Sequence, residues 1–152
     1  GQTSATVVVN VNGDTDPEAF ETFKLRIANI VGARAAAPEA SATIVDDDTP
    51  VVPIHDIQGN GATSPLVNQI VTTEGVVTGR KTNGFYLQTT DAEADADPAT
   101  SEGMYVFTST APTVATGDRV RVSGTVTEYI PVGVGQLPLT ELTRASYAKV
   151  GT

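Results

Sequence analysis

The stretch "NQIVTTEGVVTGRK", Asn68 to Lys81, alternates between small or apolar residues and more polar ones. This alternation places Val71, Thr73 and Val77 on one face, and Gly75 falls on the same face between them. A period of two residues predicts a β-strand with one buried side. Because glycine weakens the interior of a strand, its position here predicts a bend in the strand.

The stretch "DRVRVSGTVTEY", residues 118–129, repeats this pattern, with a glycine at the same step. The repetition predicts two strands that coil around one small barrel. Two shorter strands, "GFYLQTT" and "GMYVFTST", are predicted between them, and "LPLTELTRASY" is predicted as a strand after them. Five strands are the number expected of an OB-type barrel, and an acidic loop is expected between two of them, at 91–103.

The residues before the barrel predict a separate and smaller β segment. Strands are expected at "ATVVVNV" (5–11), "ETFKLRIANI" (21–30) and "SATIVD" (41–46). Three strands with one apolar face are marginal unless they pack on something else. Residues 49–65, "TPVVPIHDIQGNGATSP", are rich in Pro, Gly and Asn, and we expect a linker and an entry loop there. The fold class is therefore all-β, with segments 1–48, 49–65 and 66–152.

Composition limits the possible functions. The net charge is −9 and no cluster of Lys and Arg is visible, so strong autonomous binding to nucleic acid is not expected. The absence of cysteine excludes disulfides and thiolate metal sites. No apolar run approaches the roughly 20 residues that span a bilayer. The N-terminus lacks the pattern of a signal peptide, and we expect the chain to be a segment of a longer protein.

Three consecutive carboxylates, Asp46, Asp47 and Asp48, follow the predicted strand in "IVDDD". Like charges repel one another when a site is empty, and they become compatible around a dication. Ca²⁺ takes six to eight oxygen ligands, so the triplet is a candidate calcium site. The alternative is a solvated strand end whose charges discourage edge-to-edge aggregation.

A second acidic stretch, "DAEADADPATSE", imitates a calcium-binding loop. Asp91, Glu93, Asp95, Asp97 and Glu102 fall at positions 1, 3, 5, 7 and 12 of an EF-hand register. The register has alanine where that loop needs glycine, and a proline follows soon after. A flexible acidic loop between barrel strands is the favoured interpretation.

His55 and Asp56 are adjacent and suggest a general base. Catalysis also needs a nucleophile or a metal that other groups position, and His55 is the only histidine in the chain. We therefore expect His55 to pack at the mouth of the barrel and to bond its own loop. No catalytic residue is predicted.

Barrels of the OB type bind nucleic acid with aromatic and basic side chains, mainly on their middle strands. Alternation allows only one of Phe85 and Tyr86 to point outward. Arg119 and Arg121 face outward if the valines between them face the core, and there they could meet either phosphate or the acidic loop. The candidate nucleic-acid-binding residues are Arg80, Lys81, Phe85, Tyr86, Tyr105, Arg119 and Arg121, with Phe107 and Arg144 as further aromatic and basic side chains.

The stretch "GDTDPEAFETFKLRIANIVGARAAAPEASATIVDDD", Gly13 to Asp48, resembles the C-terminal half of a Calx-beta domain. A Gly-Asp turn, an acidic residue, a Glu-Thr-Phe strand start, a Gly-Ala turn and terminal aspartates follow in the order of that family. The resemblance implies part of an Ig-like β-sandwich whose acidic end holds Ca²⁺. It places Asp14 and Glu18 beside the aspartate triplet.

The stretches "IHDIQGNGATSPLVNQIVTTEGVVTGRKTNGFYLQTTD", "DPATSEGMYVFTS" and "GDRVRVSGTVTEY", within residues 54–145, are similar to the OB-like domain of secreted bacterial nucleases. In that family the domain precedes a catalytic domain of the endonuclease/exonuclease/phosphatase type. No stretch of this sequence matches the metal-dependent machinery of that catalytic domain.

This second resemblance implies a noncatalytic accessory segment of an extracellular or cell-surface protein. It implies weak binding of single-stranded DNA or RNA, and a nuclease domain that follows in the parent chain. The alternative is a structural or adhesion spacer, stiffened by Ca²⁺, that orients neighbouring domains.

Overall fold

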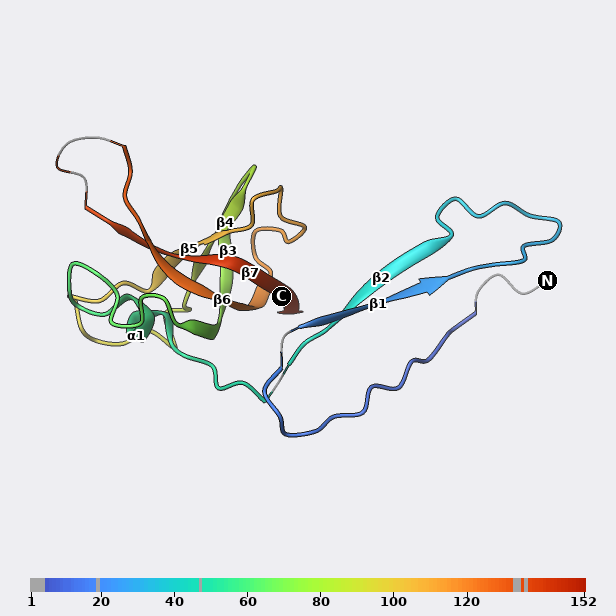
Figure 1. Ribbon diagram of the computed structural model, residues 1–152, viewed down its shortest axis with the longest axis horizontal. Coiled ribbons are helices and arrows are strands. Elements are labelled where there is room, and N and C mark those ends of the chain that lie inside the picture. The colour runs from blue at the N-terminus through green and yellow to red at the C-terminus, as the bar shows by residue number, and fades with distance from the viewer. Residues whose placement is uncertain (1–4, 19, 47, 133–134, 136) are drawn as a thin grey trace. The chain divides into compact units, whose positions relative to one another are not determined.

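The computed structural model describes residues 5–18, 20–46, 48–132, 135 and 137–152. The chain divides into two compact units, Gly1–Asp48 and Thr49–Thr152. In the described residues the regular structure consists of strands and one short helix, so the predicted all-β class is confirmed (Figure 1).

The first unit contains a two-stranded antiparallel sheet of β1 (Glu21–Arg26) and β2 (Glu39–Ile44). The Nζ of Lys24 lies 2.7 Å from Oε1 of Glu39 across this sheet. The strand predicted at 5–11 is not formed, and its valines are exposed. A strand needs a hydrogen-bonding neighbour and cover for its apolar face. The described part of this unit is therefore a two-stranded sheet and not a sandwich.

The second unit is a closed barrel in the order β3-β4-β5-β7-β6. Neighbouring strands are antiparallel except β5 and β7, which are parallel. The strands are β3 (Ile70–Lys81), β4 (Gly84–Gln88), β5 (Gly103–Phe107), β6 (Arg119–Tyr129) and β7 (Leu139–Gly151). Each one falls within or overlaps the stretch predicted for it.

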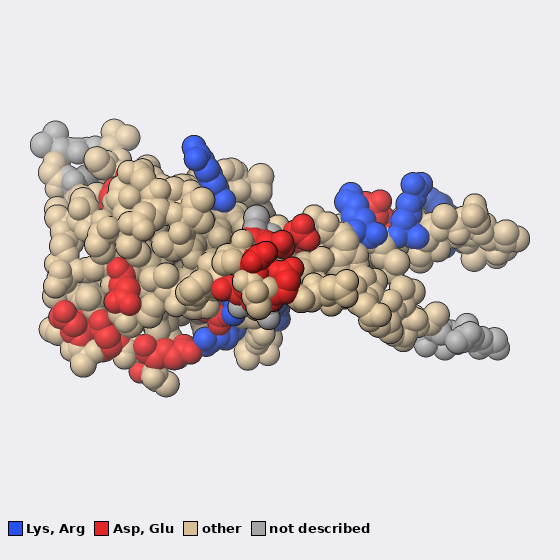
Figure 2. Space-filling model, turned by 60° about the horizontal axis from the view of Figure 1, so that its bottom comes forward, with Lys and Arg blue, Asp and Glu red and all other residues tan. Residues whose placement is uncertain are grey.

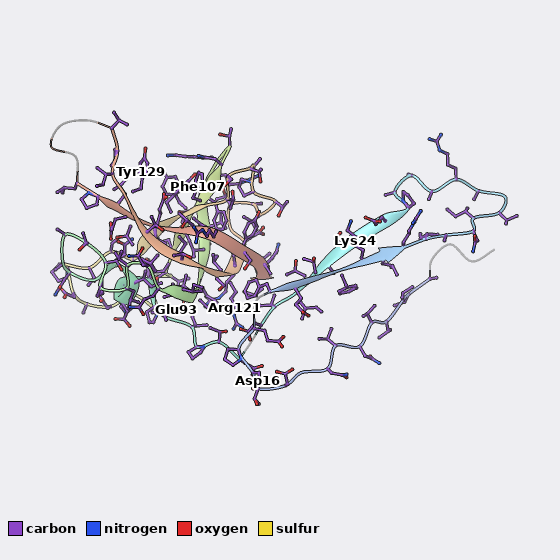
Figure 3. All side chains as sticks on the ribbon, in the orientation of Figure 1. Asp16, Lys24, Glu93, Phe107, Arg121 and Tyr129 are labelled. Carbon is purple, nitrogen blue, oxygen red and sulfur yellow. The ribbon has the colours of Figure 1, made fainter. Side chains whose placement is uncertain are left out.

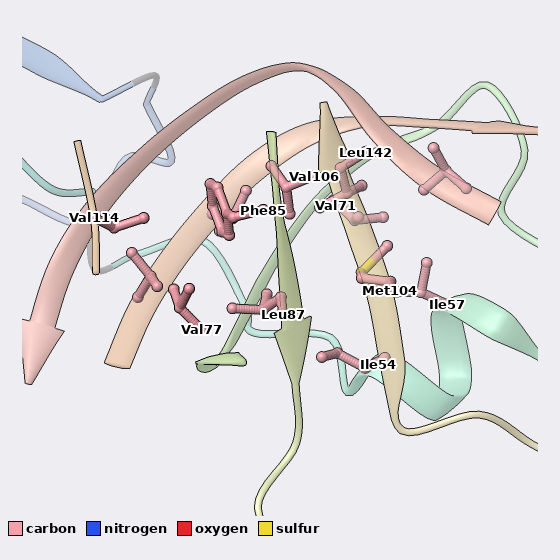
Figure 4. Close-up of a cluster of buried hydrophobic side chains, with 13 residues drawn as sticks. Ile54, Ile57, Val71, Val77, Phe85, Leu87, Met104, Val106, Val114 and Leu142 are labelled. Carbon is pink, nitrogen blue, oxygen red and sulfur yellow. The ribbon is translucent and has the colours of Figure 1, made fainter. Parts of the chain in front are cut away.

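The interior of the barrel holds the apolar core (Figure 4). Val71, Thr73 and Val77 point inward from β3, as their alternation predicts. Gly75 lies among them because β4 passes close by: a Cβ there would be 2.7 Å from the carbonyl oxygen of Gln88. The buried apolar residues are Ile54, Ile57, Val71, Val77, Phe85, Leu87, Met104, Val106, Val114, Val120, Val122, Val126 and Leu142.

The segment 49–65, predicted as a linker and entry loop, includes regular structure in addition to loops. It contains the helix α1 (Ile54–Gln58), and both Ile54 and Ile57 are 0% exposed. The hydroxyl of Ser64 donates a hydrogen bond to the carbonyl of Ile57 at 2.5 Å, and the Ser64 N–H donates to Glu128 on β6 at 2.6 Å. Burial of the two isoleucines makes the segment part of the barrel unit.

Candidate functional site

A groove of about 610 Å³ lies on the outer side of the barrel and includes residues of β4 and β5. Tyr86 and Tyr105 are paired across these strands, and their ring centroids are 5.1 Å apart. Alternation along β4 turns Tyr86 outward, with 40% of it exposed, and turns Phe85 into the core, with 0% exposed. Phe85, a predicted nucleic-acid contact, is therefore a core residue.

Lys81, at the end of β3, brings a positive charge to the two tyrosines. Its Nζ lies 5.2 Å from the ring centroid of Tyr86 and 5.3 Å from that of Tyr105, which are cation–π distances. The polar contact with Tyr86 raises the pKa of Lys81. The Tyr105 hydroxyl donates to Oδ1 of Asn83 at 2.9 Å, which fixes the direction of that ring. The structure thus brings three of the predicted contacts together.

The groove also contains residues from strands distant in the sequence. Phe107 on β5 and Tyr129 on β6 lie on the same side of the barrel and line the groove (Figure 3). Tyr129 was not predicted, although an exposed aromatic residue at the end of a strand is a usable signal. Glu141 on β7 lines the groove as well, and burial raises its pKa.

Arg144 reaches the groove through an irregularity in β7. Its φ is 51°, and the β6–β7 register shifts between Ser123 and Thr125 at this point. A bulge turns a side chain away from the direction that simple alternation would give it. Within the described residues, neither Arg144 nor Lys81 makes an ion pair.

The other basic side chains predicted to contact nucleic acid pair with groups of the protein outside the groove. Arg119 Nε lies 3.2 Å from Glu74 Oε2 and its Nη2 lies 2.8 Å from Glu93 Oε1, while Arg121 Nε lies 2.7 Å from Glu74 Oε1. The hydrogen bonds from Arg119 lower the pKa of Glu93 to about 2. Arg80 donates to the carbonyl oxygen of Pro112 at 2.5 Å. The two β6 arginines therefore meet carboxylates, one of them in the acidic loop.

The acidic end of the first unit forms a hollow of about 70 Å³. Its acidic lining residues are Asp14, Asp16, Glu18, Glu21, Asp46 and Asp48. The N–H groups of Glu18 and Asp48 donate to the Asp46 carboxylate at 3.1 and 2.9 Å. The negative charge of Asp14, more than that of any other neighbour, raises the pKa of Glu18. Four of the five predicted calcium ligands share this hollow, and the fifth, Asp47, lies outside the described residues.

His55, which was predicted to bond its own loop, has its closest side-chain contacts with the acidic loop at 91–103. Its Nδ1 lies 3.2 Å from Oε1 of Glu102 and 3.9 Å from Oδ2 of Asp95. The EF-hand register is not reproduced, because Glu93 pairs with Arg119 instead of joining this cluster. The sequence could not reveal the contact, because α1 and the loop are far apart in the chain.

On the face shown in Figure 2, acidic side chains gather into patches, and Lys and Arg side chains lie apart from most of them. In the part of the chain that the structure describes, no helix has the length and apolar character needed to cross a membrane. Comparison with protein-family models, curated proteins and solved structures gives no significant match.

Proposed function

We propose that the barrel is an OB-type module that binds single-stranded nucleic acid weakly, without catalysing a reaction. We further propose that it belongs to a secreted bacterial nuclease-like protein and guides the strand toward a metal-dependent phosphodiesterase domain in the parent chain. The observation that carries the proposal is the cluster of Tyr86, Tyr105 and Lys81 in the groove. The resemblance of residues 54–145 to nuclease-associated domains supports the choice of parent.

The position of the cluster supports this function. OB-type barrels bind oligonucleotides on the face of their second and third strands, and here those strands are β4 and β5. An outward tyrosine from each strand offers a stacking surface for an unpaired base. Such stacking contributes about 1–3 kcal/mol per base and does not depend on base identity. Bases inside a duplex are already stacked, so a single strand suits this groove better.

The charges of the groove argue for weak binding. Lys81 and Arg144 lack carboxylate partners among the described residues and are available to phosphate. Glu141 lines the same groove and opposes an anionic ligand. Because few phosphates can be neutralised, affinity should be modest and should fall only gradually with added salt.

A fluorescence anisotropy titration with labelled oligothymidylate tests the proposal. We expect Tyr86→Ala and Tyr105→Ala each to weaken binding by about 5- to 150-fold, the equivalent of losing one stacked base. Lys81→Ala should reduce the slope of log affinity against log salt by about 0.7, the value for one phosphate on a single strand.

Lys149→Ala is the matched control, because it removes the same charge from a lysine that pairs with Asp118 at 2.6 Å and does not line the groove. Equal losses of affinity in Lys81→Ala and Lys149→Ala would show that the effect comes from the net charge of the protein and not from the groove. If the anisotropy does not change even at low salt, the proposal that the barrel binds nucleic acid is contradicted.

A second function, a spacer stiffened by Ca²⁺, is favoured by the acidic hollow of the first unit. Asp14, Glu18, Asp46 and Asp48 line one small space, and their mutual repulsion would be relieved by a dication. We expect Ca²⁺ at about 0.1–1 mM, the range of extracellular modules, to shift the backbone NMR signals of these residues. Asp46→Asn should abolish the response and Asp91→Asn should not. Signals that are indifferent to Ca²⁺ would count against this function.

A further inference from the structure

We propose that His55, Asp95 and Glu102 form a binding site for a divalent transition metal such as Zn²⁺, which fastens the acidic loop to α1. The three residues each offer one ligand atom, and these atoms all lie within 4.8 Å of one another. They come from two distant parts of the barrel unit. The site is separate from the groove and from the acidic hollow of the first unit.

The separation of His55 and Glu102 is close to that around a small metal ion, and the Asp95 carboxylate lies slightly farther away. In a tetrahedral zinc site with bonds of about 2.0–2.2 Å, the ligand atoms are roughly 3.3–3.6 Å apart. The Nδ1 of His55 is 3.2 Å from Glu102 Oε1 and 3.9 Å from Asp95 Oδ2. One imidazole and two carboxylates leave a fourth position for water, and the imidazole favours Zn²⁺ over Ca²⁺.

Neighbouring groups already hold the three ligands in place. The Thr100 hydroxyl lies 3.0 Å from each carboxylate oxygen of Asp95, and the N–H of Asp95 donates to Glu102 Oε1 at 2.9 Å. The other ring nitrogen of His55, Nε2, faces the Asp56 carboxylate at 4.0 Å. The exposed fractions of the side chains are 16% for His55, 27% for Asp95 and 23% for Glu102, so that His55 is the most buried of the three.

Thr89, directly after β4, lies next to Glu102. Its backbone N–H donates to the carbonyl of Glu102 at 2.8 Å, and its buried side chain lies beside the Glu102 carboxylate. Burial raises the pKa of Glu102, but the Asp95 N–H, His55 and the nearby Thr89 side chain together hold it below its usual value. These contacts hold the Glu102 side chain next to His55.

A direct ion pair between protonated His55 and Glu102 would also explain the 3.2 Å separation. The two explanations differ in what Zn²⁺ does. If the metal site exists, the ion displaces the ring proton at Nδ1, whereas a simple ion pair is indifferent to Zn²⁺. Because His55 is the only histidine of the chain, its imidazole signals can be followed without ambiguity.

The test is titration of the whole chain with Zn²⁺, followed by calorimetry and by NMR of the imidazole nitrogens. We expect one equivalent to bind and to shift the Nδ1 signal. His55→Gln, Asp95→Asn and Glu102→Gln should each weaken binding by at least about tenfold. Asp97→Asn and Glu93→Gln remove the same charge from the same loop outside the cluster and should leave the affinity unchanged.

The NMR measurement uses the unaltered chain, so it remains decisive if a variant fails to fold. Imidazole signals that do not respond to millimolar Zn²⁺ would overturn the proposal. Binding that persists at equal affinity in His55→Gln would overturn it too, because the ion would then occupy other carboxylates.

Discussion

At the scale of single residues, Gly84 controls the position of one groove tyrosine. A Cβ at Gly84 would collide with the carbonyl oxygen of Val106 and with the ring of Tyr105. We therefore expect Gly84→Ala to displace Tyr105, to lower the free energy of unfolding by about 1–3 kcal/mol and to weaken oligonucleotide binding. Urea denaturation and anisotropy measure the two effects. Gly103→Ala, whose Cβ would meet no atom closer than 3.7 Å, should change both much less, and equal effects would contradict this explanation.

The Glu93–Arg119 pair makes a prediction about pH. Hydrogen bonds from Arg119 lower the pKa of Glu93 from 4.5 to about 2 in the folded protein. Because the folded pKa is the lower one, the pair stabilises the fold fully above pH 4.5 and loses its effect as the pH falls toward 2. Glu93→Gln should therefore lower the melting temperature at pH 6, and the difference from wild type should shrink toward pH 2. A difference that stays constant with pH would contradict the assignment, and Asp91→Asn serves as the control.

At the scale of elements, α1 shows where a sequence pattern is too short to interpret. Five residues cannot display a helical period, and the surrounding Pro, Gly and Asn residues favour a loop. Weak signals were present, since Pro53 precedes the helix and Gly59, with a φ of 65°, ends it. The isoleucines at 54 and 57 are also spaced to share one face of a helix. These signals can be interpreted only in the folded barrel, where both isoleucine side chains are part of the core.

The burial of α1 makes a prediction about stability. Ile57 is 0% exposed, so Ile57→Ala should lower the free energy of unfolding by about 2–5 kcal/mol through lost burial and a cavity. Chemical denaturation followed by far-ultraviolet circular dichroism measures this change. Ile70→Ala alters a residue that is 76% exposed and should cost little. Equal stability of the two variants would mean that α1 is not part of the cooperative core.

At the scale of the whole molecule, local pattern predicts strands better than it predicts sites. The barrel strands follow from a period of two, because that period reflects burial on one face. The pairing of Arg119 and Arg121 with Glu74 depends on the register between β3 and β6, which single-strand patterns do not contain. The same holds for Arg144, whose direction depends on a bulge. Lys81, Tyr86 and Tyr105 could be predicted because they lie on consecutive strands of the barrel.

The distribution of the core predicts that the second unit folds alone. All buried apolar residues in the described parts of the chain lie between Ile54 and Leu142, and the first unit contributes none. A fragment of residues 49–152 should therefore unfold in one cooperative transition at the melting temperature of the barrel in the whole chain. Its affinities for oligothymidylate and Zn²⁺ should be unchanged, whereas the NMR response to Ca²⁺ should be lost with residues 1–48. A fragment that unfolds without cooperativity would show that the barrel needs the first unit, and the two proposed functions could then no longer be assigned to separate parts of the chain.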